Sequence, residues 1–308
     1  MQLKIGDTAL ITGGASGIGL GMAEAFGAAG VKVIIADINA SALADAGRAL
    51  RKAGVAARAV VLDVTSFDSW VEAARAIADA GPVDILCNNA GVAQARITFD
   101  KHLEMVDVPV PLWQMIMDVN VNGVFLGMKT FAPGMIARGR GHIVNTASMA
   151  GLLAPGGLSA YIASKFAVMG LSESAAAELA PQGVGMSILC PGGVQSNLVV
   201  NTAAMRSRLP GMDGGGVKDL ITAPLPHAPK MSPRMVGDRV LKAIRDDELF
   251  IITHPEYEPL IEERFAAVRA SIGPSTQPGY VDTPAMLERS RNKVYLAQRA
   301  HRQGGVAP

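Results

Sequence analysis

The sequence predicts an α/β fold in which a doubly wound parallel sheet of about seven strands carries helices on both faces. Short, nearly continuous apolar runs recur along the chain, which is typical of strands buried on both faces. Helix-favouring stretches separate these runs, as expected for crossovers between parallel strands. The strands are expected at residues 8–12, 31–37, 59–64, 83–87, 141–146, 184–190 and 249–252, and the helices at about 40–53, 67–80, 112–138, 159–180 and 233–246.

The first apolar run, residues 8–12, leads into a glycine-rich turn that contains Gly13, Gly17 and Gly19. Helix-forming residues follow at 22–26, and the next strand completes one Rossmann-type βαβ unit. Glycines at this turn allow backbone N–H groups and the helix N-terminus to approach a pyrophosphate. Turn chemistry alone explains a lone glycine-rich loop equally well, so the dinucleotide interpretation needs a second feature.

Asp37 supplies that feature. It closes the second strand, 18 residues after Gly19, where a carboxylate accepts hydrogen bonds from an adenosine ribose. The same carboxylate repels a 2′-phosphate. Neither Ser16 nor Asn39 offers a cation to hold that phosphate, so NAD is expected rather than NADP.

Further polar residues follow the carboxyl ends of later strands. Asp63, Asn89 and Ser148 each stand at or just beyond such an end. Ligands of open α/β sheets bind outside this edge, so these residues are expected in the active site. Asn120 lies within an apolar helix and therefore needs a polar partner.

Tyr161 and Lys165 stand four residues apart at the start of a predicted helix, which places both on one face. An ammonium about 4 Å from the phenol, at an effective dielectric of about 20, contributes roughly 4 kcal/mol. That would bring a tyrosine pKa from about 10 to near 7, where proton transfer is efficient. Such a pair is also common on ordinary amphipathic helices, so its meaning depends on the rest of the chain.

The last third of the chain departs from the alternating pattern. A Gly-, Pro- and Met-rich stretch, about 193–233, predicts a mobile substrate lid, in which His227 is expected to be an ordinary loop residue. Residues 1–253 are expected to form the catalytic domain. Residues 254–308 are expected to form a helical extension rather than an independent domain, and its apolar stripe, Ile261, Phe265, Val268 and Ile272, must pack somewhere.

Composition excludes several functions. The 308 residues carry a formal net charge of +1, which argues against nucleic acid or an anionic membrane as partner. Cys87 and Cys190 end apolar runs and are expected to be buried free thiols of a reducing compartment. No metal-ligand cluster and no membrane-spanning run is apparent, and the first strand begins too early for a signal peptide. A cytoplasmic protein is expected.

Together these motifs resemble the short-chain dehydrogenase/reductase family, in its single-domain NAD(P)-dependent branch, over roughly residues 5–253. The resemblance is carried by the glycine turn from Thr12 to Gly19, the pair Asp63-Val64, the run Asn88-Asn89-Ala90-Gly91, the set Asn120, Ser148, Tyr161 and Lys165, and the loop Pro191-Gly192-Gly193-Val194. Two residues depart from the family pattern. Ser196 stands where threonine is usual, and Ala147 where a second serine is frequent.

The resemblance implies a division of roles. Asn120, Ser148, Tyr161 and Lys165 are the implied catalytic residues, with Tyr161 as the acid–base group, Lys165 also binding the nicotinamide ribose, and Asn120 anchoring a water behind Lys165. The implied cofactor-binding residues are Gly13, Ser16, Gly17, Ile18, Gly19, Asp37, Asp63, Val64, Asn89, Ala90, Gly91, Tyr161, Lys165, Pro191, Gly192, Val194 and Ser196. A homodimer or homotetramer is also implied.

The expected activity is NAD-dependent interconversion of a secondary alcohol and its ketone. Apolar residues around the predicted site, including Met149, Leu152 and Leu153, favour a bulky, hydrophobic or aromatic substrate. The tail is similar to that of a longer subgroup whose members oxidise such alcohols. Two alternatives remain: a lyase resembling halohydrin dehalogenases, which carry arginine in place of Lys165 and lack the glycine loop, and a non-catalytic nucleotide-sensing protein.

Overall fold

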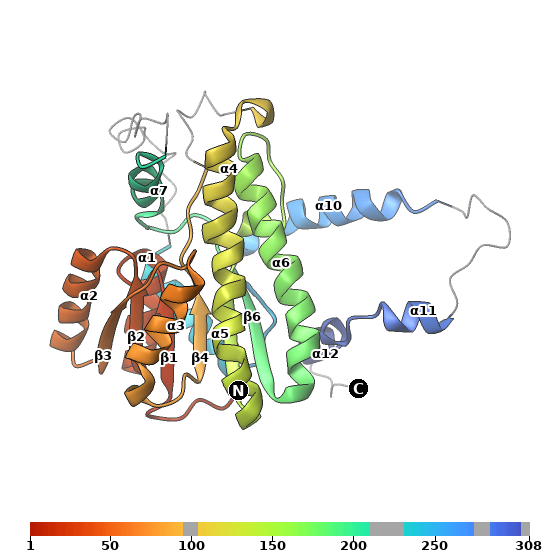
Figure 1. Ribbon diagram of the computed structural model, residues 1–308. Helices are drawn as coiled ribbons and strands as arrows, with labels where there is room; N and C mark the ends of the chain where they lie inside the picture. Colours follow the sequence, from red (N-terminus) through yellow and green to blue (C-terminus); the bar gives the residue numbers. More distant parts are fainter. Residues whose placement is uncertain (95–103, 210–230, 274–283, 303–308) are drawn as a thin grey trace.

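The computed structural model describes residues 1–94, 104–209, 231–273 and 284–302. Within these residues lies a seven-stranded parallel sheet of order β3-β2-β1-β4-β5-β6-β7 (Figure 1). Its strands are β1 (Thr8–Thr12), β2 (Lys32–Asp37), β3 (Ala57–Val61), β4 (Ile85–Asn88), β5 (Gly141–Thr146), β6 (Val184–Cys190) and β7 (Phe250–Ile252). The predicted doubly wound sheet is confirmed. The strand order reverses between β1 and β4, and ligands bind at such a switch point.

Helices cover both faces of the sheet. One face carries α3 (Phe67–Ala76), α5 (Gly123–Arg138) and α6 (Ser159–Leu179), and the other carries α1 (Gly17–Ala28), α2 (Ala40–Lys52) and α9 (Pro233–Arg245) (Figure 1). Because side chains alternate along a strand, β1 feeds both cores. Leu10 belongs to the same core as Trp70, whereas Ile11 belongs to the core that contains Phe26. Complete burial of each such side chain contributes roughly 1.5–3 kcal/mol.

Helices α1 and α9 cross where each carries a glycine. A Cβ at Gly21 would lie 2.2 Å from Pro233 O, and a Cβ at Gly237 would lie 2.3 Å from Gly21 O. Backbone atoms of packed helices cannot move aside as the end of a side chain can. Only glycine therefore allows this contact, which joins the helix after the glycine loop to the helix before β7.

Some boundaries differ from the prediction. The third strand spans residues 57–61 rather than 59–64, because its partner β2 ends at Asp37, which pairs with Val61. The single helix expected at 112–138 is α4 (Val110–Met117), a π-helical turn over Asp118–Asn122, and α5. The π turn interrupts the helix at the position of Asn120.

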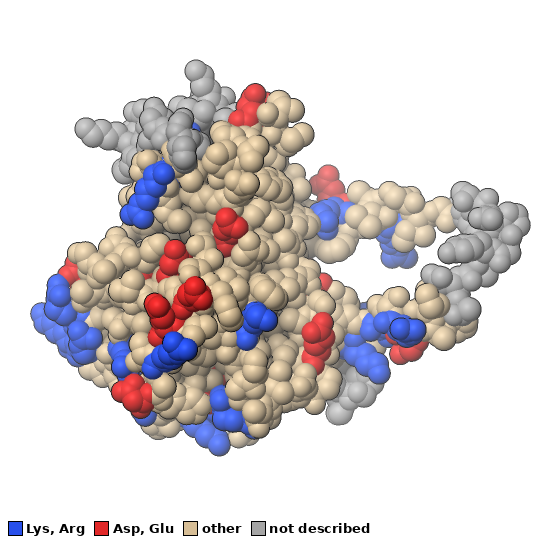
Figure 2. Space-filling view, in the orientation of Figure 1, with Lys and Arg blue, Asp and Glu red and all other residues tan. Residues whose placement is uncertain are grey.

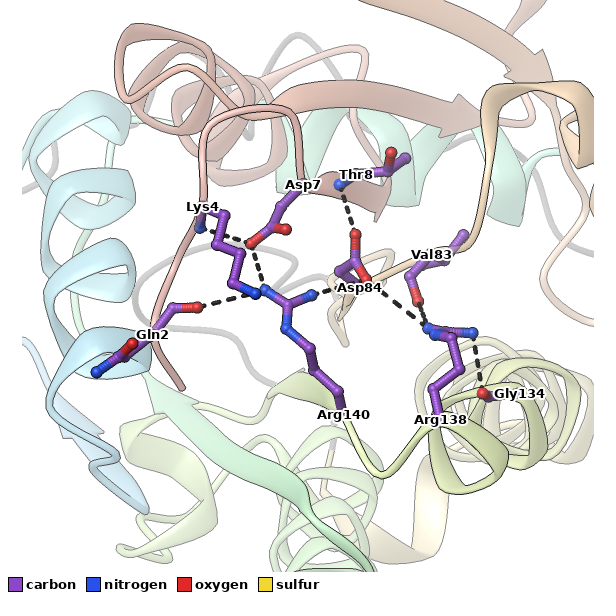
Figure 3. A network of polar contacts seen from close by, with 9 residues as sticks. All are labelled: Gln2, Lys4, Asp7, Thr8, Val83, Asp84, Gly134, Arg138 and Arg140. Atoms are coloured by element: carbon purple, nitrogen blue, oxygen red, sulfur yellow. Dashed lines mark hydrogen bonds and ion pairs between the residues drawn. The ribbon is translucent and has the colours of Figure 1, made fainter.

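Charged side chains tie the amino-terminal ends of the strands together (Figure 3). Arg140 lies between two carboxylates, with Nη2 2.8 Å from Asp7 Oδ2 and Nη1 2.9 Å from Asp84 Oδ1. Asp84 Oδ2 accepts a hydrogen bond from Thr8 N at 3.0 Å, and Arg138 Nη2 lies 3.8 Å from Asp84 Oδ1. The Asp7 carboxylate raises the pKa of Arg140. This network stands at the edge opposite the predicted active site, so we assign it to stability.

After β7 the chain forms α10 (Glu258–Ala270), α11 (Pro284–Arg289) and α12 (Lys293–Arg302). Helix α12 returns to the globule, where Gln298 Oε1 accepts a hydrogen bond from Leu249 N at 2.6 Å and Asn292 Nδ2 donates to Glu173 O at 3.0 Å. Helix α10 projects away from the globule (Figure 1), and charged side chains of both signs lie among its uncharged surface (Figure 2).

The apolar stripe of α10 packs only at its start. Ile261 packs against the core, whereas Phe265, Val268 and Ile272 are 52%, 55% and 77% exposed. Within the described residues of this single chain the stripe therefore packs only at Ile261, because the helix leaves the globule after it, and where the rest of the stripe packs stays a prediction.

Both cysteines are free and buried, as predicted. Burial raises the pKa of Cys87 well above its usual range and raises that of Cys190 to about 12. None of the helices in the described ranges combines the length and the apolar character needed to cross a bilayer.

Candidate active site

Two loops meet at the switch point of the sheet. Gly13 has φ +63°, and a Cβ there would lie 3.0 Å from Ala90 Cα. A Cβ at Gly19 would lie 2.3 Å from Gly13 O and 2.8 Å from Asn89 Nδ2. Thr12 Oγ1 accepts hydrogen bonds from Asn89 N at 2.9 Å and Ala90 N at 3.0 Å. The loops after β1 and β4 thus form one close-packed cradle that side chains at the glycines would fill.

The N-terminus of α1 opens onto this cradle. Ser16 occupies the N-cap position, but its side chain makes no capping hydrogen bond to the first turn. Gly17 has φ +52°, and a Cβ there would lie 3.0 Å from Ser196 Cβ. The loop after β6 therefore lies over the glycine loop, while Ile18 packs against the core beneath α1. Uncapped N–H groups and absent side chains fit the pyrophosphate of a dinucleotide.

A cavity of about 280 Å³ lies beside the cradle. Seven of the predicted cofactor residues line it: Gly13, Ser16, Asp37, Asp63, Val64, Ala90 and Gly91. The remaining predicted cofactor residues do not line the cavity. They are Gly17, Ile18, Gly19, Asn89, Tyr161, Lys165, Pro191, Gly192, Val194 and Ser196. Gly19 and Asn89 act on the cavity indirectly, because they shape the cradle.

The two predicted acidic residues are held differently. Asp37 Oδ2 accepts a hydrogen bond from Ala15 N at 3.3 Å, and its Oδ1 accepts one from Asn39 N at 3.0 Å. Two backbone donors therefore fix this carboxylate at the cavity. Asp63 Oδ1 instead accepts hydrogen bonds from Thr65 N at 2.9 Å and Thr65 Oγ1 at 2.7 Å, so its carboxylate orders its own loop.

Asn120 lies in the π turn and is 1% exposed. Its Oδ1 accepts a hydrogen bond from Val92 N at 2.8 Å, while its Nδ2 donates to Val92 O and to Ser164 Oγ, both at 2.9 Å. The predicted polar partner is thus the backbone beyond β4. Asn120 joins this backbone to α6, because one N–H of its side-chain amide donates to Val92 O and the other donates to Ser164 Oγ of α6.

The other three predicted catalytic residues lie together at the carboxyl edge of the sheet. The Ser148 hydroxyl lies next to the Tyr161 side chain. Its Oγ donates a hydrogen bond to Pro191 O at 3.4 Å and accepts one from Ala150 N at 3.1 Å. Lys165 Nζ lies 5.5 Å from the centre of the Tyr161 ring and donates to Thr146 O at 2.9 Å. Ser148 and Lys165 are buried, at 9% and 4% exposure, and Tyr161 remains partly exposed.

Burial dominates the titration of this group. It raises the pKa of Tyr161, an effect that the neighbouring Ser148 hydroxyl opposes. Burial also lowers the pKa of Lys165 to about 8, because the ammonium loses hydration. The prediction that Lys165 brings the pKa of Tyr161 to near 7 is wrong for this structure, since desolvation of the phenolate is the larger effect.

Sequence reasoning missed His254, which lies just beyond β7. Its Nδ1 accepts a hydrogen bond from Gly192 N at 3.1 Å, so this nitrogen carries no proton. A Cβ at Gly192 would lie 2.7 Å from His254 Cγ. The histidine thereby supports the loop that begins at Pro191. Its place after a strand end, the rule that located Ser148, could have found it.

The described part of the predicted lid is anchored at its base. Gln195 N donates to Met231 O at 3.1 Å, and Met231 N donates to Gly193 O at 3.2 Å. Within it, α7 (Leu198–Arg206) is fixed by Thr202 Oγ1, which accepts a hydrogen bond from Ala93 N at 2.9 Å. Residues 210–230, which include His227, lie outside the described residues.

The α7 segment contributes cavity residues that the sequence did not indicate. They are Asn197, Asn201, Ala204, Met205 and Arg208. The segment was expected to cover substrate, but in the structure its described part lines the cofactor cavity. No local pattern marks these residues, because only the fold of the lid brings them there.

The model of the short chain dehydrogenase family matches residues 7–207, about two thirds of the chain. The match includes the glycine cradle and all four predicted catalytic residues. The chain belongs to the short-chain dehydrogenase family. It is therefore an oxidoreductase that uses a nicotinamide cofactor and acts on a small molecule.

Similar proteins include several dehydrogenases. The chain is 33% identical over 276 residues to C alpha-dehydrogenase of Sphingobium sp. (strain NBRC 103272 / SYK-6), covering 86% of each chain. It is 39% identical over 198 residues to 3beta-hydroxysteroid dehydrogenase 2 of Eggerthella lenta, covering 63% of this chain and 74% of that one.

Solved structures extend the similarity over nearly the whole chain. A short-chain dehydrogenase of Novosphingobium aromaticivorans aligns with TM-score 0.77 and 33% identity, covering 96% of this chain and 98% of that one. A short-chain dehydrogenase/reductase of Burkholderia phymatum in complex with NAD aligns with TM-score 0.77 and 30% identity, covering 91% and 100%.

Proposed function

We propose that this protein is an NAD-dependent dehydrogenase that interconverts a bulky, hydrophobic or aromatic secondary alcohol and its ketone. The proposal is carried by the Ser148 hydroxyl next to the Tyr161 phenol, with Lys165 beside the tyrosine ring. Two hydroxyl groups next to a buried cation can hold an alcohol oxygen and move its proton. The glycine cradle stands at the same edge of the sheet.

Each side chain has a separate role in this mechanism. Bound NAD supplies the hydride chemistry at C4 of its nicotinamide. Tyr161 takes the hydroxyl proton of the alcohol during oxidation and returns it during reduction. Ser148 donates to the substrate oxygen as negative charge develops there. Lys165, oriented by Thr146 O, stabilises the ionised form of Tyr161 and is the residue expected to bind the nicotinamide ribose.

Asn120 acts through its neighbours. Its hydrogen bonds to Val92 and Ser164 fix the cofactor side of the site relative to α6. The water expected behind Lys165 would bind at the remaining acceptor position of Asn120 Oδ1.

Asp37 supports NAD rather than NADP as the cofactor. Its carboxylate is fixed by backbone N–H groups of Ala15 and Asn39 and faces the cavity. A fixed carboxylate accepts hydrogen bonds from ribose hydroxyls and repels a phosphate. The similar Burkholderia phymatum protein was crystallised with NAD.

Apolar side chains support a bulky substrate. Met149, Leu152 and Leu153 follow Ser148 directly and pack into the core beside the site, and Leu158 lies partly buried at the start of α6. The name of the Eggerthella relative, a 3beta-hydroxysteroid dehydrogenase, agrees with an alcohol of this class.

We also infer assembly into a homodimer or homotetramer, as the family resemblance implies. Trp113 and Phe125 remain 42% and 47% exposed on α4 and α5, which lie beside α6 on one side of the molecule (Figure 1). Sedimentation velocity of the full chain tests this inference, and a purely monomeric protein would contradict it.

A spectrophotometric screen of secondary alcohols and ketones with NAD and with NADP tests the proposed function. We expect turnover with NAD and an aryl or steroid alcohol, and a shift toward NADP in Asp37→Ser. Tyr161→Phe should lose turnover by roughly 10²–10⁴-fold but retain NADH binding, as read from NADH fluorescence. The matched control is Tyr295→Phe, whose hydroxyl contacts Glu173 away from the site.

Two results would contradict the proposal. One is the absence of NADH formation with every alcohol in the panel, simple polyols included. The other is a Tyr161→Phe enzyme that turns over at the wild-type rate.

A further inference from the structure

Three consecutive residues beyond the β4 loop are each hydrogen-bonded to a different element. Val92 is bound by Asn120 of the π turn, and Ala93 N donates to Thr202 of α7. Gln94 Oε1 accepts a hydrogen bond from Ala160 N, in the first turn of α6, at 2.9 Å. This short segment therefore connects the cofactor loop, the lid and the helix that carries Tyr161.

Gln94 is the side chain that caps α6. The N-cap residue Leu158 offers no side-chain acceptor, so the first N–H groups of the helix need another one. Gln94 is 2% exposed, and the orientation of its amide is fixed because only the oxygen can accept from Ala160 N. Its Nε2 is buried and has no hydrogen-bond partner in the part of the chain that the structure describes.

A buried, unpartnered N–H₂ group is costly, and a glutamate at position 94 would avoid it. A carboxylate would accept the same hydrogen bond and carry no donor, and the helix N-terminus would offset part of the cost of burying its charge. The sequence nevertheless has the neutral amide. The capped residue, Ala160, directly precedes Tyr161, so a carboxylate there would add a buried negative charge to the turn that carries Tyr161 and oppose ionisation of its phenol.

We propose that Gln94 is a positioning residue that fixes the first turn of α6, and with it Tyr161, without adding a buried negative charge to the turn that carries the phenol. This inference rests on the acid–base role proposed for Tyr161. The titratable groups that the described contacts place around the phenol are Lys165 of the same helix and the Cys190 thiol of β6, which interacts electrostatically with Lys165. Neither carries a negative charge near neutral pH, since burial raises the pKa of Cys190 to about 12, so a carboxylate at position 94 would add one to this part of the site.

Two variants separate capping from charge. Gln94→Glu keeps the acceptor and adds a charge, whereas Gln94→Met keeps the approximate volume and removes the acceptor. The pKa of Tyr161 is read from tyrosinate absorbance immediately after a pH jump, as the difference between each variant and the same variant carrying Tyr161→Phe. Urea unfolding midpoints and NADH binding are measured on the same proteins.

Gln94→Glu should keep the cap on α6 and raise the pKa of Tyr161 by roughly one unit. Gln94→Met should unfold at a lower urea concentration and, where a substrate is known, lose about tenfold in kcat at every pH. The inference is overturned if Gln94→Glu leaves the pKa of Tyr161 unchanged, or if Gln94→Met unfolds and turns over like the wild type. The absorbance titration needs no substrate, so it tests the role of Gln94 even if the activity screen shows that the proposed function is wrong.

Discussion

Lys165 Nζ donates a hydrogen bond to Thr146 O at 2.9 Å, so the catalytic helix α6 is fixed to the last residue of β5 through a buried ammonium. Burial lowers the pKa of this lysine from 10.5 to about 8. The unfolded chain therefore binds more protons than the folded chain between these two pH values. The cost of burying the charge is fully present below pH 8 and disappears as the pH rises toward 10.5.

Lys165→Met should make the protein inactive but more stable. At neutral pH it removes a desolvation cost of about 3 kcal/mol and loses one hydrogen bond, so the free energy of unfolding should rise by about 1–2 kcal/mol. The advantage should shrink between pH 8 and 10.5. Urea unfolding across this range is the measurement, with Lys129→Met, an exposed position on α5, as the control. A variant less stable than the wild type at neutral pH would contradict the argument.

The raised pKa of Tyr161 sets the direction of the pH dependence. Alcohol oxidation needs the ionised phenol, which is scarce at neutral pH when burial raises the pKa. In the proposed mechanism kcat/KM for oxidation should therefore rise with pH, by up to about tenfold per unit, while ketone reduction, which uses the neutral phenol, should stay level until the pH approaches the raised pKa. Initial rates in both directions over a buffer series measure this. An oxidation rate that is highest below neutral pH would contradict it.

His142, buried in β5, should make the protein sensitive to acid. Burial lowers its pKa to about 3, and its Nε2 lies 2.9 Å from Ser187 Oγ. Because the unfolded histidine titrates near 6.5, stability is full above that pH and should fall by up to about 4 kcal/mol as the pH drops toward 3. His142→Gln keeps an N–H for Ser187 and does not titrate, so its urea midpoint should fall less steeply with acid. Parallel curves for the two proteins would exclude this role.

The carboxylate of Asp84 should matter more than a surface carboxylate. It accepts hydrogen bonds from Thr8 N and Arg140 Nη1 and is 7% exposed (Figure 3). Asp84→Asn replaces one acceptor with a donor, which should cost about 2–3 kcal/mol of unfolding free energy. Asp79→Asn, in an exposed ion pair with Arg58, should leave the urea midpoint unchanged. Equal effects of the two substitutions would show that the network contributes nothing special.

Local patterns predict most of the sheet because each buried strand is an apolar run. The edge strand β3 was placed too late, since its ladder is set by the length of β2 and not by its own side chains. The π turn at Asn120 has no sequence pattern of its own. The exposed face of α10 could not be foreseen either, because periodicity shows that a helix has an apolar side but not what covers it.

The candidate site divides in the same way. Gly13, Asp37, Ser148, Tyr161 and Lys165 were predictable, because each stands at a strand end or at a fixed helical spacing. The cavity residues of α7 and the cap from Gln94 depend on tertiary contacts between segments far apart in the sequence. The pKa of Tyr161 was mispredicted for a related reason: spacing gives the distance to a cation, whereas desolvation depends on everything packed around the phenol.

The glycine-to-glycine crossing of α1 and α9 means that the helix after the glycine loop depends on a helix more than 200 residues further along the chain. The family match stops at residue 207, yet the helix whose first turn opens onto the cradle rests, backbone on backbone, against Pro233 and Gly237. A fragment cut at the end of that match would keep every predicted catalytic side chain but lose the support on which its first helix lies. For this fold, the smallest piece worth expressing therefore runs through β7.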